Sequence, residues 1–444
     1  MKSTSFPTRA LAAGVAGSAL VAAPLALTAG PASAAGTTID VAVTGNDANP
    51  GTPSAPLRTV QAAVDKAVAG TTIKIHKGVY DGQIKIRKSG TASAPITVTN
   101  AGDGAVTLTS TQPMPACSSN QPDGMRTILI IDGSDYWTFQ GLNIVNGVYA
   151  TGSDAGNAFT WHNTLVEKGD WQTRRKVPGA GSYSPTAAKQ VIPYLRTVTK
   201  TPTLDSADGI KFLNNTITKK GLFFRMSSYG VVSGNKITDV ACGTGPGVWL
   251  ITFSNGWQVT KNDVSKIAPS TWKHFMQEGI RLGTSSNYNS VTNNNVHDLA
   301  GDGRAYNTDV DSSWNTFSGN KATNVAIGYN DQMSGWGNVW KNNSVTSFRT
   351  YGFGVRLMDG KLTLPSYNSS ANKINMTCNV VSKPVGTAKS FGVGGTMYGT
   401  YAGNAWTTAQ VGKNVAVYWG KYGNTWNGTK SAPPKSARQR PPPS

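Results

Sequence analysis

Short runs of alternating apolar and polar residues, bounded by Gly, Asn and Ser, fill most of the chain after residue 200. Within them an apolar-x-x-Asn-x-apolar phrase recurs, with its asparagine at Asn215, Asn235, Asn262, Asn295, Asn320, Asn343 and, in a degenerate last copy, Asn379. The spacing drifts but returns to the low twenties, which is typical of one coil of a parallel β-solenoid whose longer coils carry loops. The runs have the period of strands, and no amphipathic helix is expected to interrupt them.

The recurring asparagine is interpreted as structural. Asparagine tolerates left-handed backbone, and its amide can bond the amide of the neighbouring coil in a ladder. We therefore expect one asparagine at the same place in each coil, with no part in any chemistry.

The first part of the mature chain has a different pattern. The stretch "TVQAAVDKAV" predicts a helix that places Val60, Ala63, Val64 and Ala67 on one face. An open solenoid end exposes strand edges and core, so a terminal cap is needed. We expect this helix to be the N-terminal cap.

Three stretches carry a family resemblance over about residues 38 to 147: "GTPSAPLRTVQAAVDKAVAGTTIKIHKGVY", "SGTASAPITVTNAGDGAVTLTS" and "IIDGSDYWTFQGLNIVNG". They resemble the N-terminal halves of secreted right-handed parallel β-helix polysaccharide lyases, namely the alginate and dermatan lyase family and the related pectate lyases. The resemblance implies an all-β chain folded as a right-handed parallel β-helix. It says little about the substrate, because function depends on sites grafted onto a fold.

The two ends of the chain are set apart from this domain. Residues 1–34 are typical of a secretory signal peptide, because Lys2 and Arg9 precede an apolar run that ends in Ala32-Ser33-Ala34. No second apolar span long enough for a membrane anchor follows. We expect one β-helix domain over residues 35–427 and a disordered, basic, proline-rich tail over 428–444. The well-separated Cys117, Cys242 and Cys378 allow at most one disulfide.

The charge of the chain points to an anionic partner. The formal net charge is +19 at pH 7, and the chain stays strongly basic without its two ends. A basic cleft concentrates negative ligands, and for an exported protein the candidates are acidic polysaccharides, teichoic-acid-like cell-wall polymers and extracellular DNA. The alternative is a basic secreted protein whose charge serves solubility. A nucleic-acid role is not expected, because the histidines are scattered and no metal motif accompanies them. A monomer is expected.

Residues 150–206 break the coil rhythm and predict a long loop insertion. Such a loop is usually functional, and this one combines Trp161 and Trp171 with Arg174 and Arg175. Aromatic faces stack on sugar rings and guanidinium groups bind carboxylates, so the loop is interpreted as a wall of a saccharide-binding cleft. The alternative is a disordered surface insertion.

One position in each coil is predicted to point outward from a strand that begins near Gly-apolar-X. Strand alternation and coil stacking then align six side chains on one outer face: Arg225, Trp249, Arg281, Tyr306, Tyr329 and Arg356. A stripe of arginine and aromatic residues is a plausible track for an anionic sugar chain. The alternative is that these residues only cover strand backbone.

Carboxylates concentrate in the same coils, at Glu278, Asp302, Asp309, Asp311 and Asp331. Such a cluster can hold Ca²⁺ through oxygen ligands, or supply the acid and base of a hydrolase. The remaining alternative is turn residues paired with arginines. Glu278, three residues before Arg281, is interpreted as a partner that orients Arg281 or as a metal ligand.

The stretch "QEGIRLGTSS" is similar to the lyase segment in which an acid precedes a cationic strand residue. The next coil departs from that family, because it has Arg304 and Tyr306 where the family tends to have glutamates, and Asp311 roughly where its lysine would fall. The family's metal ligands and base therefore cannot be carried over. In a β-elimination a cation or metal neutralises the uronate carboxylate and a base removes the C5 proton. The candidates for these roles are Lys211, Arg281, Arg304, Tyr306 and Tyr329.

We thus expect a secreted carbohydrate-active enzyme, a lyase of uronate-containing polysaccharide. Two alternatives stay open. An inverting glycoside hydrolase would use paired aspartates such as Asp309 and Asp331. A non-catalytic glycan-binding β-helix would use the arginine-aromatic stripe alone.

Overall fold

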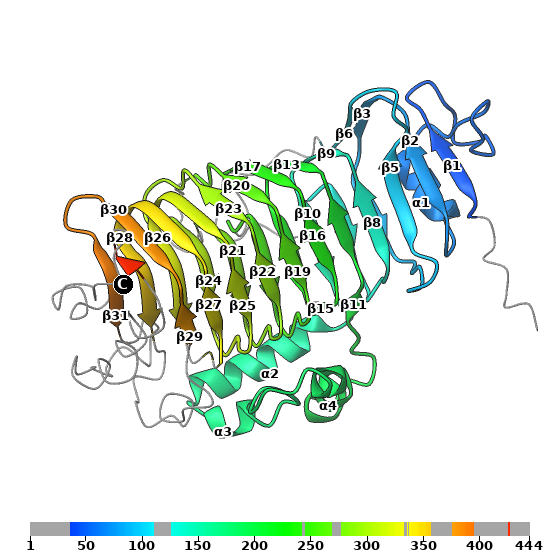
Figure 1. The fold of residues 1–444 in the computed structure, drawn as a ribbon. Coiled ribbons are helices and arrows are strands. Elements are labelled where there is room, and N and C mark those ends of the chain that lie inside the picture. The colour runs from blue at the N-terminus through cyan, green and yellow to red at the C-terminus, as the bar shows by residue number, and fades with distance from the viewer. Residues whose placement is uncertain are drawn as a thin grey trace, which may run out of the picture. The chain divides into compact units, whose positions relative to one another are not determined.

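The computed structural model describes residues 36–110, 126–241, 245–268, 277–332, 335, 337–356, 375–394 and 425–426. In these residues every strand pairing between named strands is parallel, and the strands stack in successive coils (Figure 1). Each coil visits three faces in turn, called here A, B and C. The predicted signal peptide and the basic tail lie outside the described residues, so export stays a prediction.

Face A is one sheet made of β1 (Thr38–Val41), β2 (Thr72–Ile75), β5 (Ile96–Asn100), β8 (Trp137–Gln140), β12 (Lys211–Leu213), β16 (Val231–Ser233), β19 (Gln258–Thr260), β22 (Ser290–Thr292), β25 (Thr316–Ser318), β27 (Val339–Lys341) and β29 (Asn375–Thr377). Face B contains β3 (Gly78–Asp81), β6 (Val106–Thr109), β9 (Asn143–Val145), β13 (Thr216–Lys219), β17 (Lys236–Val240), β20 (Asp263–Ser265), β23 (Asn295–His297), β30 (Val380–Pro384) and β32 (Thr425–Trp426). Face C contains β4 (Ile84–Ile86), β7 (Ile128–Ile130), β10 (Val148–Thr151), β14 (Leu222–Arg225), β18 (Val248–Ile251), β21 (Glu278–Gly283), β24 (Arg304–Thr308) and β31 (Lys389–Gly394).

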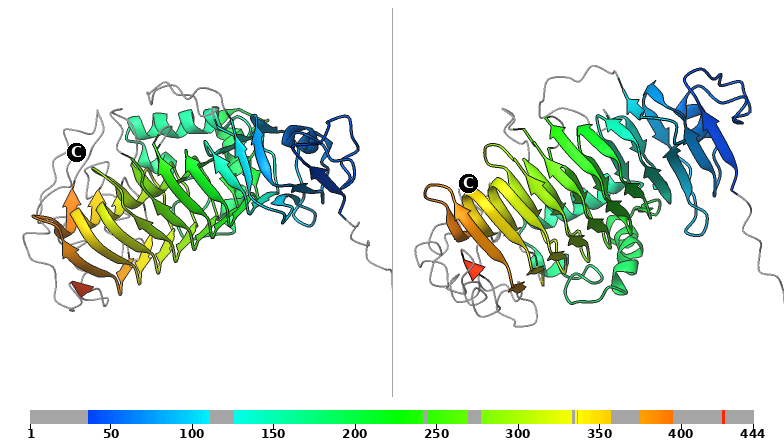
Figure 2. Two further views of the ribbon diagram at one scale, coloured as in Figure 1. Left: turned by 90° about the horizontal axis from the view of Figure 1, so that it is seen from above. Right: turned by 45° about the horizontal axis from the view of Figure 1, so that its top comes forward.

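Faces B and C join into one sheet because β26 (Lys321–Gln332) and β28 (Ser344–Arg356) run through both. The short strands β11 (Ala207–Asp208) and β15 (Ser227–Ser228) pair in the turn between faces C and A. Figure 2 shows the same succession of coils in two further views.

The core is filled by the inward positions of the three faces. On face A one buried column runs through Phe212, Val232, Val259, Val291, Phe317, Trp340 and Met376. Apolar residues alternate with polar ones along each short strand, so each coil buries one side against the coils around it. The chain is thus the right-handed parallel β-helix that the sequence predicts.

The asparagine ladder is present, with one shift. Its members are Asn215, Asn235, Asn262, Asn294, Asn320, Asn343 and Asn379. From Asn235 onward, each amide oxygen accepts from the backbone N–H and the side-chain amide of the preceding coil's asparagine, at 2.9 to 3.0 Å for the Asn262–Asn294 step. The repeat phrase, with Val291 and Val296 as its apolar ends, selects Asn294, so the assignment to Asn295 was wrong by one residue, and Asn295 is the first residue of β23. A second ladder, not predicted, joins Asn289, Asn315 and Asn338 at the turn into face A.

The predicted N-terminal helix is α1 (Val60–Lys66), and Thr59 caps it by accepting from the Ala62 N–H. Val60, Ala63, Val64 and Ala67 are buried as predicted. The helix lies against β1, β2 and β4 in the first coils. Its role as a cap stays a prediction.

The insertion over residues 150–206 is helical, so the prediction of an open loop was wrong. It contains α2 (Ala155–Glu167), α3 (Trp171–Arg174), a 3₁₀ turn (Ala187–Gln190) and α4 (Val191–Thr199). These helices bury their own small core, which includes Ala158, Val191 and Leu195. They lie along one edge of the stacked coils (Figure 1). Among the described helices, none has the length and apolar composition needed to cross a membrane.

Candidate functional site

The outer surface of face C carries one continuous column of side chains. Strand register aligns Tyr149, Phe223, Trp249, Arg281, Asn307 and Asn330 in successive coils. Their neighbours within each strand point inward to the core, so strand alternation sends this column outward. The column therefore changes from aromatic to cationic to amide along the β-helix.

The aromatic half of the column is stacked ring on ring. Phe223 and Trp249 lie 4.6 Å apart with their planes 11° from parallel, and Tyr149 lies 5.0 Å from Phe223. The Arg281 guanidinium sits 5.4 Å from the Trp249 ring centre. Because their faces contact one another, these rings offer mainly their edges to a ligand. Stacking of sugars on the faces of Trp249 and its neighbours, as the sequence suggested, does not fit this arrangement.

Arg281 is the centre of a buried charge network. Its Nη1 donates to Glu278 Oε2 at 2.6 Å, and its Nη2 contacts Asp309 Oδ2. The other oxygen of Glu278 accepts from Asn307 Nδ2 at 2.9 Å and from Arg304 Nη1 at 3.3 Å. The side chains of Glu278 and Asp309 are 2% and 1% exposed. Glu278 therefore orients Arg281, which is one of the two roles expected for it.

The backbone at Gly283 leaves a space beside this network. A Cβ at Gly283 would lie 3.5 Å from Asp309 Oδ1 and 3.6 Å from Trp249 Nε1, so the acid and the indole N–H border the same space. Trp249 Nε1 and Arg281 Nε are buried, and neither has a hydrogen-bond partner among the residues that the structure describes. Buried donors are nearly always satisfied in folded proteins. These two unsatisfied N–H donors mark a place where a ligand could supply a hydrogen-bond acceptor.

The outward stripe predicted from the sequence was only partly right. Tyr306 and Tyr329 point into the core, stack 5.0 Å apart, and donate their hydroxyls to backbone carbonyls. Burial raises the pKa of both hydroxyls well above 10, which makes them unsuitable as bases. The outward residues of those coils are the following asparagines, Asn307 and Asn330. The shared dipeptide Tyr-Asn in both coils was the signal that could have shown this.

The remaining stripe and base candidates lie apart from Arg281. Arg225 belongs to a second outward column, beside Ile251, and its guanidinium lies over the Phe159 ring of α2 at 5.0 Å. Arg356 ends β28 in register with Gln332, one coil beyond Asp331. Lys211 is on face A, in register with Thr138 and Val231, and therefore does not join the face C network.

The five acids proposed as metal ligands do not come together. Asp302 is exposed in a turn, and Asp331 points inward to Asn338 and Trp340. Asp311 binds His162 and Arg174, while Glu278 and Asp309 share Arg281. Over the residues that the structure describes, no three His, Cys, Asp or Glu side chains are placed to hold a metal ion.

The insertion residues proposed to bind substrate have structural positions instead. Arg174 is 2% exposed and pairs with Asp311 at 3.0 Å. Arg175 donates to the Gly181 carbonyl. Trp161 packs near Tyr194 and Phe253. Trp171 is half-buried against the main core. These contacts hold the insertion together and attach it to the coils. The four side chains are therefore used in packing and do not form the wall of a saccharide-binding cleft that was predicted.

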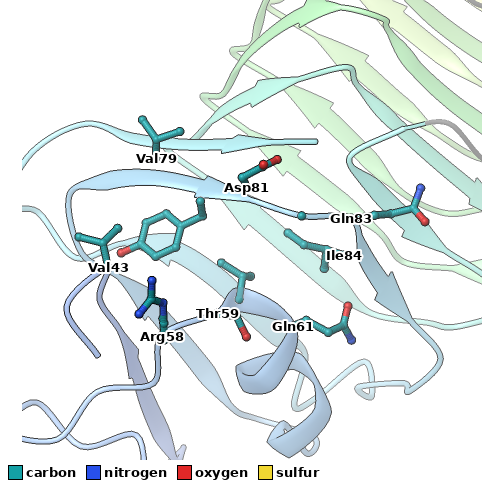
Figure 3. A pocket seen from close by; sticks show the side chains of 11 residues that line it. Val43, Arg58, Thr59, Gln61, Val79, Asp81, Gln83 and Ile84 are labelled. Carbon is teal, nitrogen blue, oxygen red and sulfur yellow. The ribbon is translucent and has the colours of Figure 1, made fainter. Parts of the chain in front are cut away.

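A separate pocket of about 390 Å³ lies among the first coils. Figure 3 shows Arg58, Val79, Asp81 and Gln83 around it. It does not contain Arg281 or any other member of the face C network, so we do not place the chemistry there.

Comparisons with known proteins agree with the fold and cover the first coils. Residues 39–176 match the family described as Pel9A-like, right handed beta helix region. Pectate lyase PEL9 of Emericella nidulans is 34% identical over 151 residues, which are 32% of this chain and 36% of that protein. Uncharacterized protein YwoF of Bacillus subtilis is 43% identical over 60 residues, which are 14% of this chain and 13% of that protein. The matches thus span about a third or less of these relatives.

Solved structures give the same picture at low identity. Pectate lyase Pel9A aligns with a TM-score of 0.46 and 16% identity, covering 84% of this chain and 81% of that one. An alginate lyase from Paenibacillus aligns with a TM-score of 0.40 and 14% identity, covering 81% and 95%. The family match over residues 39–176 and the identity to PEL9 confirm the resemblance to β-helix polysaccharide lyases that was expected from residues 38 to 147. The Arg281 network lies beyond residue 176, outside the family match.

Proposed function

We propose that this protein is a polysaccharide lyase that cleaves a uronate-containing chain by β-elimination on face C. The observation that carries the proposal is the space beside Gly283, bordered by an unsatisfied buried indole N–H, by Asp309 and by the Arg281 network. The match of residues 39–176 to a pectate-lyase-like family supports the reaction class. The excess of positive charge supports an anionic substrate.

Each residue of the network has a distinct part in the proposed reaction. The Arg281 guanidinium draws electron density from the uronate carboxylate so that the C5 proton becomes acidic. Asp309 Oδ1 takes that proton as the C4–O bond breaks, and the leaving oxygen is protonated by solvent. Trp249 Nε1 donates to a substrate oxygen. Arg304, more exposed than Arg281, holds Glu278 in place.

Calcium is implied by the lyase resemblance, but the described residues do not fit it. The two acids that lie close together, Glu278 and Asp309, already share the positive charge of Arg281, which repels a cation. A Ca²⁺ ion takes six to eight oxygen ligands, and the other candidate acids are elsewhere. No step of the proposed reaction therefore uses a metal. Secretion remains part of the proposal, as the leader-like sequence indicates.

Hydrolysis is the second candidate, favoured by one observation. Two carboxylates, Glu278 and Asp309, flank the same guanidinium and could act as an acid and a base. A lyase releases an unsaturated, ultraviolet-absorbing uronide, whereas a hydrolase releases only reducing ends.

The Gly283→Ala variant tests the proposed site. The added methyl group would make ordinary contacts with Asp309 and Trp249, so the fold should tolerate it while the space is filled. We expect kcat/KM on the best of alginate, pectate, glucuronan and glycosaminoglycans to fall at least about tenfold. Ultraviolet absorbance of the product is the measurement, made with and without EDTA.

Gly156→Ala is the matched control, because a Cβ there meets no atom within 4 Å on α2. It should leave activity unchanged. Trp249→Phe, which removes the N–H and keeps a ring, should lower kcat/KM by roughly tenfold. Full activity in Gly283→Ala would contradict the site. Reducing ends without ultraviolet absorbance would replace elimination by hydrolysis, and loss of activity with EDTA would contradict the metal-free reaction.

A further inference from the structure

A second pocket, of about 460 Å³, lies on a different side of the molecule from the face C column. The turns between faces C and A contribute Tyr136, Asp208 and Tyr229 to it, and the helical insertion contributes Lys189 and Ile192. Its size falls within the range of sites that bind small ligands. None of its lining residues belongs to the Arg281 network.

Two tyrosine rings form one side of the pocket in a regular arrangement. The Tyr136 ring lies over Gly209 of the next coil, and the Tyr229 ring lies over Gly256 of the coil after its own. A Cβ at either glycine would come within 2.7 Å of a ring carbon. The Gly209 N–H donates to the Ser228 carbonyl of the following coil. Tyr229, the residue after Ser228, therefore lies one coil beyond Gly209. The two tyrosines are therefore two coils apart, roughly 10 Å, with a glycine between them.

The same pocket is acidic although the protein is basic. Asp208 borders it, and Asp135 lies behind, accepting from the Asp208 N–H at 2.6 Å. In the described part of the chain neither carboxylate has a cationic partner, whereas nearby Asp205 pairs with Arg196 at 3.3 Å. Burial raises the pKa of both, that of Asp135 to about 6. Asp208 and Asp135 thus outnumber Lys189, the lysine in the pocket lining, and a bound cation would neutralise the remaining negative charge.

We propose that this pocket binds an amino sugar, held by its ammonium group between Asp208 and the tyrosine rings. Aromatic rings attract cations through their faces, and a carboxylate nearby adds a charge-assisted hydrogen bond. The hydroxyls of Ser206 and Ser228 and the Asn255 amide supply partners for sugar hydroxyls. A uronate is disfavoured here by the two aspartates. The proposal does not depend on the reaction assigned to face C.

The test is calorimetric titration with a disaccharide of glucosamine, its N-acetylated form and a disaccharide of galacturonate. The full chain should bind the free amine at least about tenfold more tightly than either of the others, because only that ligand is cationic. Asp208→Asn and Tyr229→Ala should each weaken binding roughly tenfold. Tyr183→Ala, which removes a 68% exposed tyrosine outside the pocket, should not.

Binding of the amine should also strengthen as the pH rises through about 6, because Asp135 loses its proton there. The other charged groups around the pocket are Lys189 and the Asp205–Arg196 pair. Equal binding of the amine and the N-acetylated sugar would overturn the proposal. So would absence of binding, or unchanged binding in Asp208→Asn. The same variants should retain elimination activity. This activity serves as the control that the variants are folded.

Discussion

The carboxyl group of Asp331 is a buried acid in the core of a basic protein. Its Oδ2 accepts from Trp340 Nε1 at 2.8 Å and from Asn338 Nδ2 at 3.1 Å, and the residue is 1% exposed. Burial raises the pKa of Asp331 to about 6, and these hydrogen bonds only partly offset the effect. The folded protein therefore holds this proton more tightly than the unfolded chain does.

The consequence is a pH dependence of stability with a definite sign. The stabilising effect of the Asp331 proton is complete below about pH 4 and is lost as the pH rises through about 6. We expect the free energy of unfolding to fall by about 3 kcal/mol over this window from Asp331 alone. In Asp331→Asn the amide keeps the acceptor for Trp340 and cannot ionise, so this component should vanish. Chemical denaturation of both proteins across the window measures the difference.

Asp302→Asn is the control, because Asp302 is exposed and its replacement should leave the pH dependence unchanged. Parallel stability curves for the native chain and Asp331→Asn would show that Asp331 is ionised in the folded protein, contrary to this account.

Single residues were also where sequence reasoning failed most often. Strand alternation has a period of two, so a shift of one residue turns every side chain to the opposite face. The predicted stripe was off by one residue in two coils. It placed Tyr306 and Tyr329 on the outer face, where the structure has Asn307 and Asn330. For Trp249 and Arg281 the same reasoning gave the right face. The Tyr-Asn dipeptide shared by both coils was the only local signal, and it is easily overlooked because tyrosine suits both a core and a binding surface.

At the scale of elements, the helical insertion is held to the coils by buried charge. Asp311 Oδ2 contacts His162 Nε2 of α2 and Arg174 Nη1 of α3, each at 3.0 Å. Ser285 of the coil also contacts His162 Nε2, at 2.9 Å. Burial acts to raise the pKa of Asp311, but Arg174 and His162 outweigh it and hold the pKa below 3.8. The ionised acid is therefore the form that fastens the insertion.

Asp311→Asn should release this attachment. It leaves Arg174 buried without its counter-charge, which typically costs about 3 to 5 kcal/mol. We expect hydrogen exchange to increase across residues 155–199 while the coils of face A stay protected. In the native chain the same opening should occur as the pH falls below about 4, since the stabilisation exists only while Asp311 is ionised.

Asp205→Asn provides the comparison, because Asp205 forms an exposed ion pair with Arg196 at the surface. Its loss should cost less than about 1 kcal/mol. Equal hydrogen exchange in the two variants would contradict this attachment. So would an increase in hydrogen exchange in Asp311→Asn that is as large in the coils as in the helices.

The helices of the insertion were missed for a physical reason. Asp154 precedes α2 without a side-chain cap hydrogen bond, and α4 contains Val, Ile and Thr, which are weak helix formers. Short helices in proteins owe most of their stability to tertiary packing. Here that packing is against Phe253 and Met226 of distant coils, which no local pattern reveals. By contrast, α1 has a capping threonine and a clean apolar face, and its extent was predictable.

At the scale of the whole molecule, the fold was predictable because the β-helix is a repeat. Successive coils use the same strand period, and from Asn215 onward they share a corner asparagine, so weak local signals add up over many coils. The candidate site was less predictable, because it depends on how Trp249, Arg281 and Asp309 of three coils align. That alignment depends on the length of the loop between successive coils, which the repeat phrase does not give.

The asparagine ladder allows the clearest test of register, because Asn294 and Asn295 are adjacent and only one belongs to it. Asn294 Oδ1 accepts from both Asn262 amides, and its own Nδ2 donates to the Val259 carbonyl at 2.8 Å. Asn294→Ala would leave these buried groups unsatisfied, at a cost of at least about 3 kcal/mol. Asn295→Ala loses only a part-buried bond to Asp263, worth about 1 kcal/mol or less.

Denaturant unfolding of the two alanine variants beside the native chain measures this contrast. Because coils contact mainly their neighbours, the loss at Asn294 should also increase hydrogen exchange in the adjoining coils, around Asn262 and Asn320, more than at either end. A larger loss for Asn295→Ala would place Asn295 in the ladder, one residue away from the register described here. It would also move Arg281 and Asn307 off the outer column, and with them the proposed site on face C.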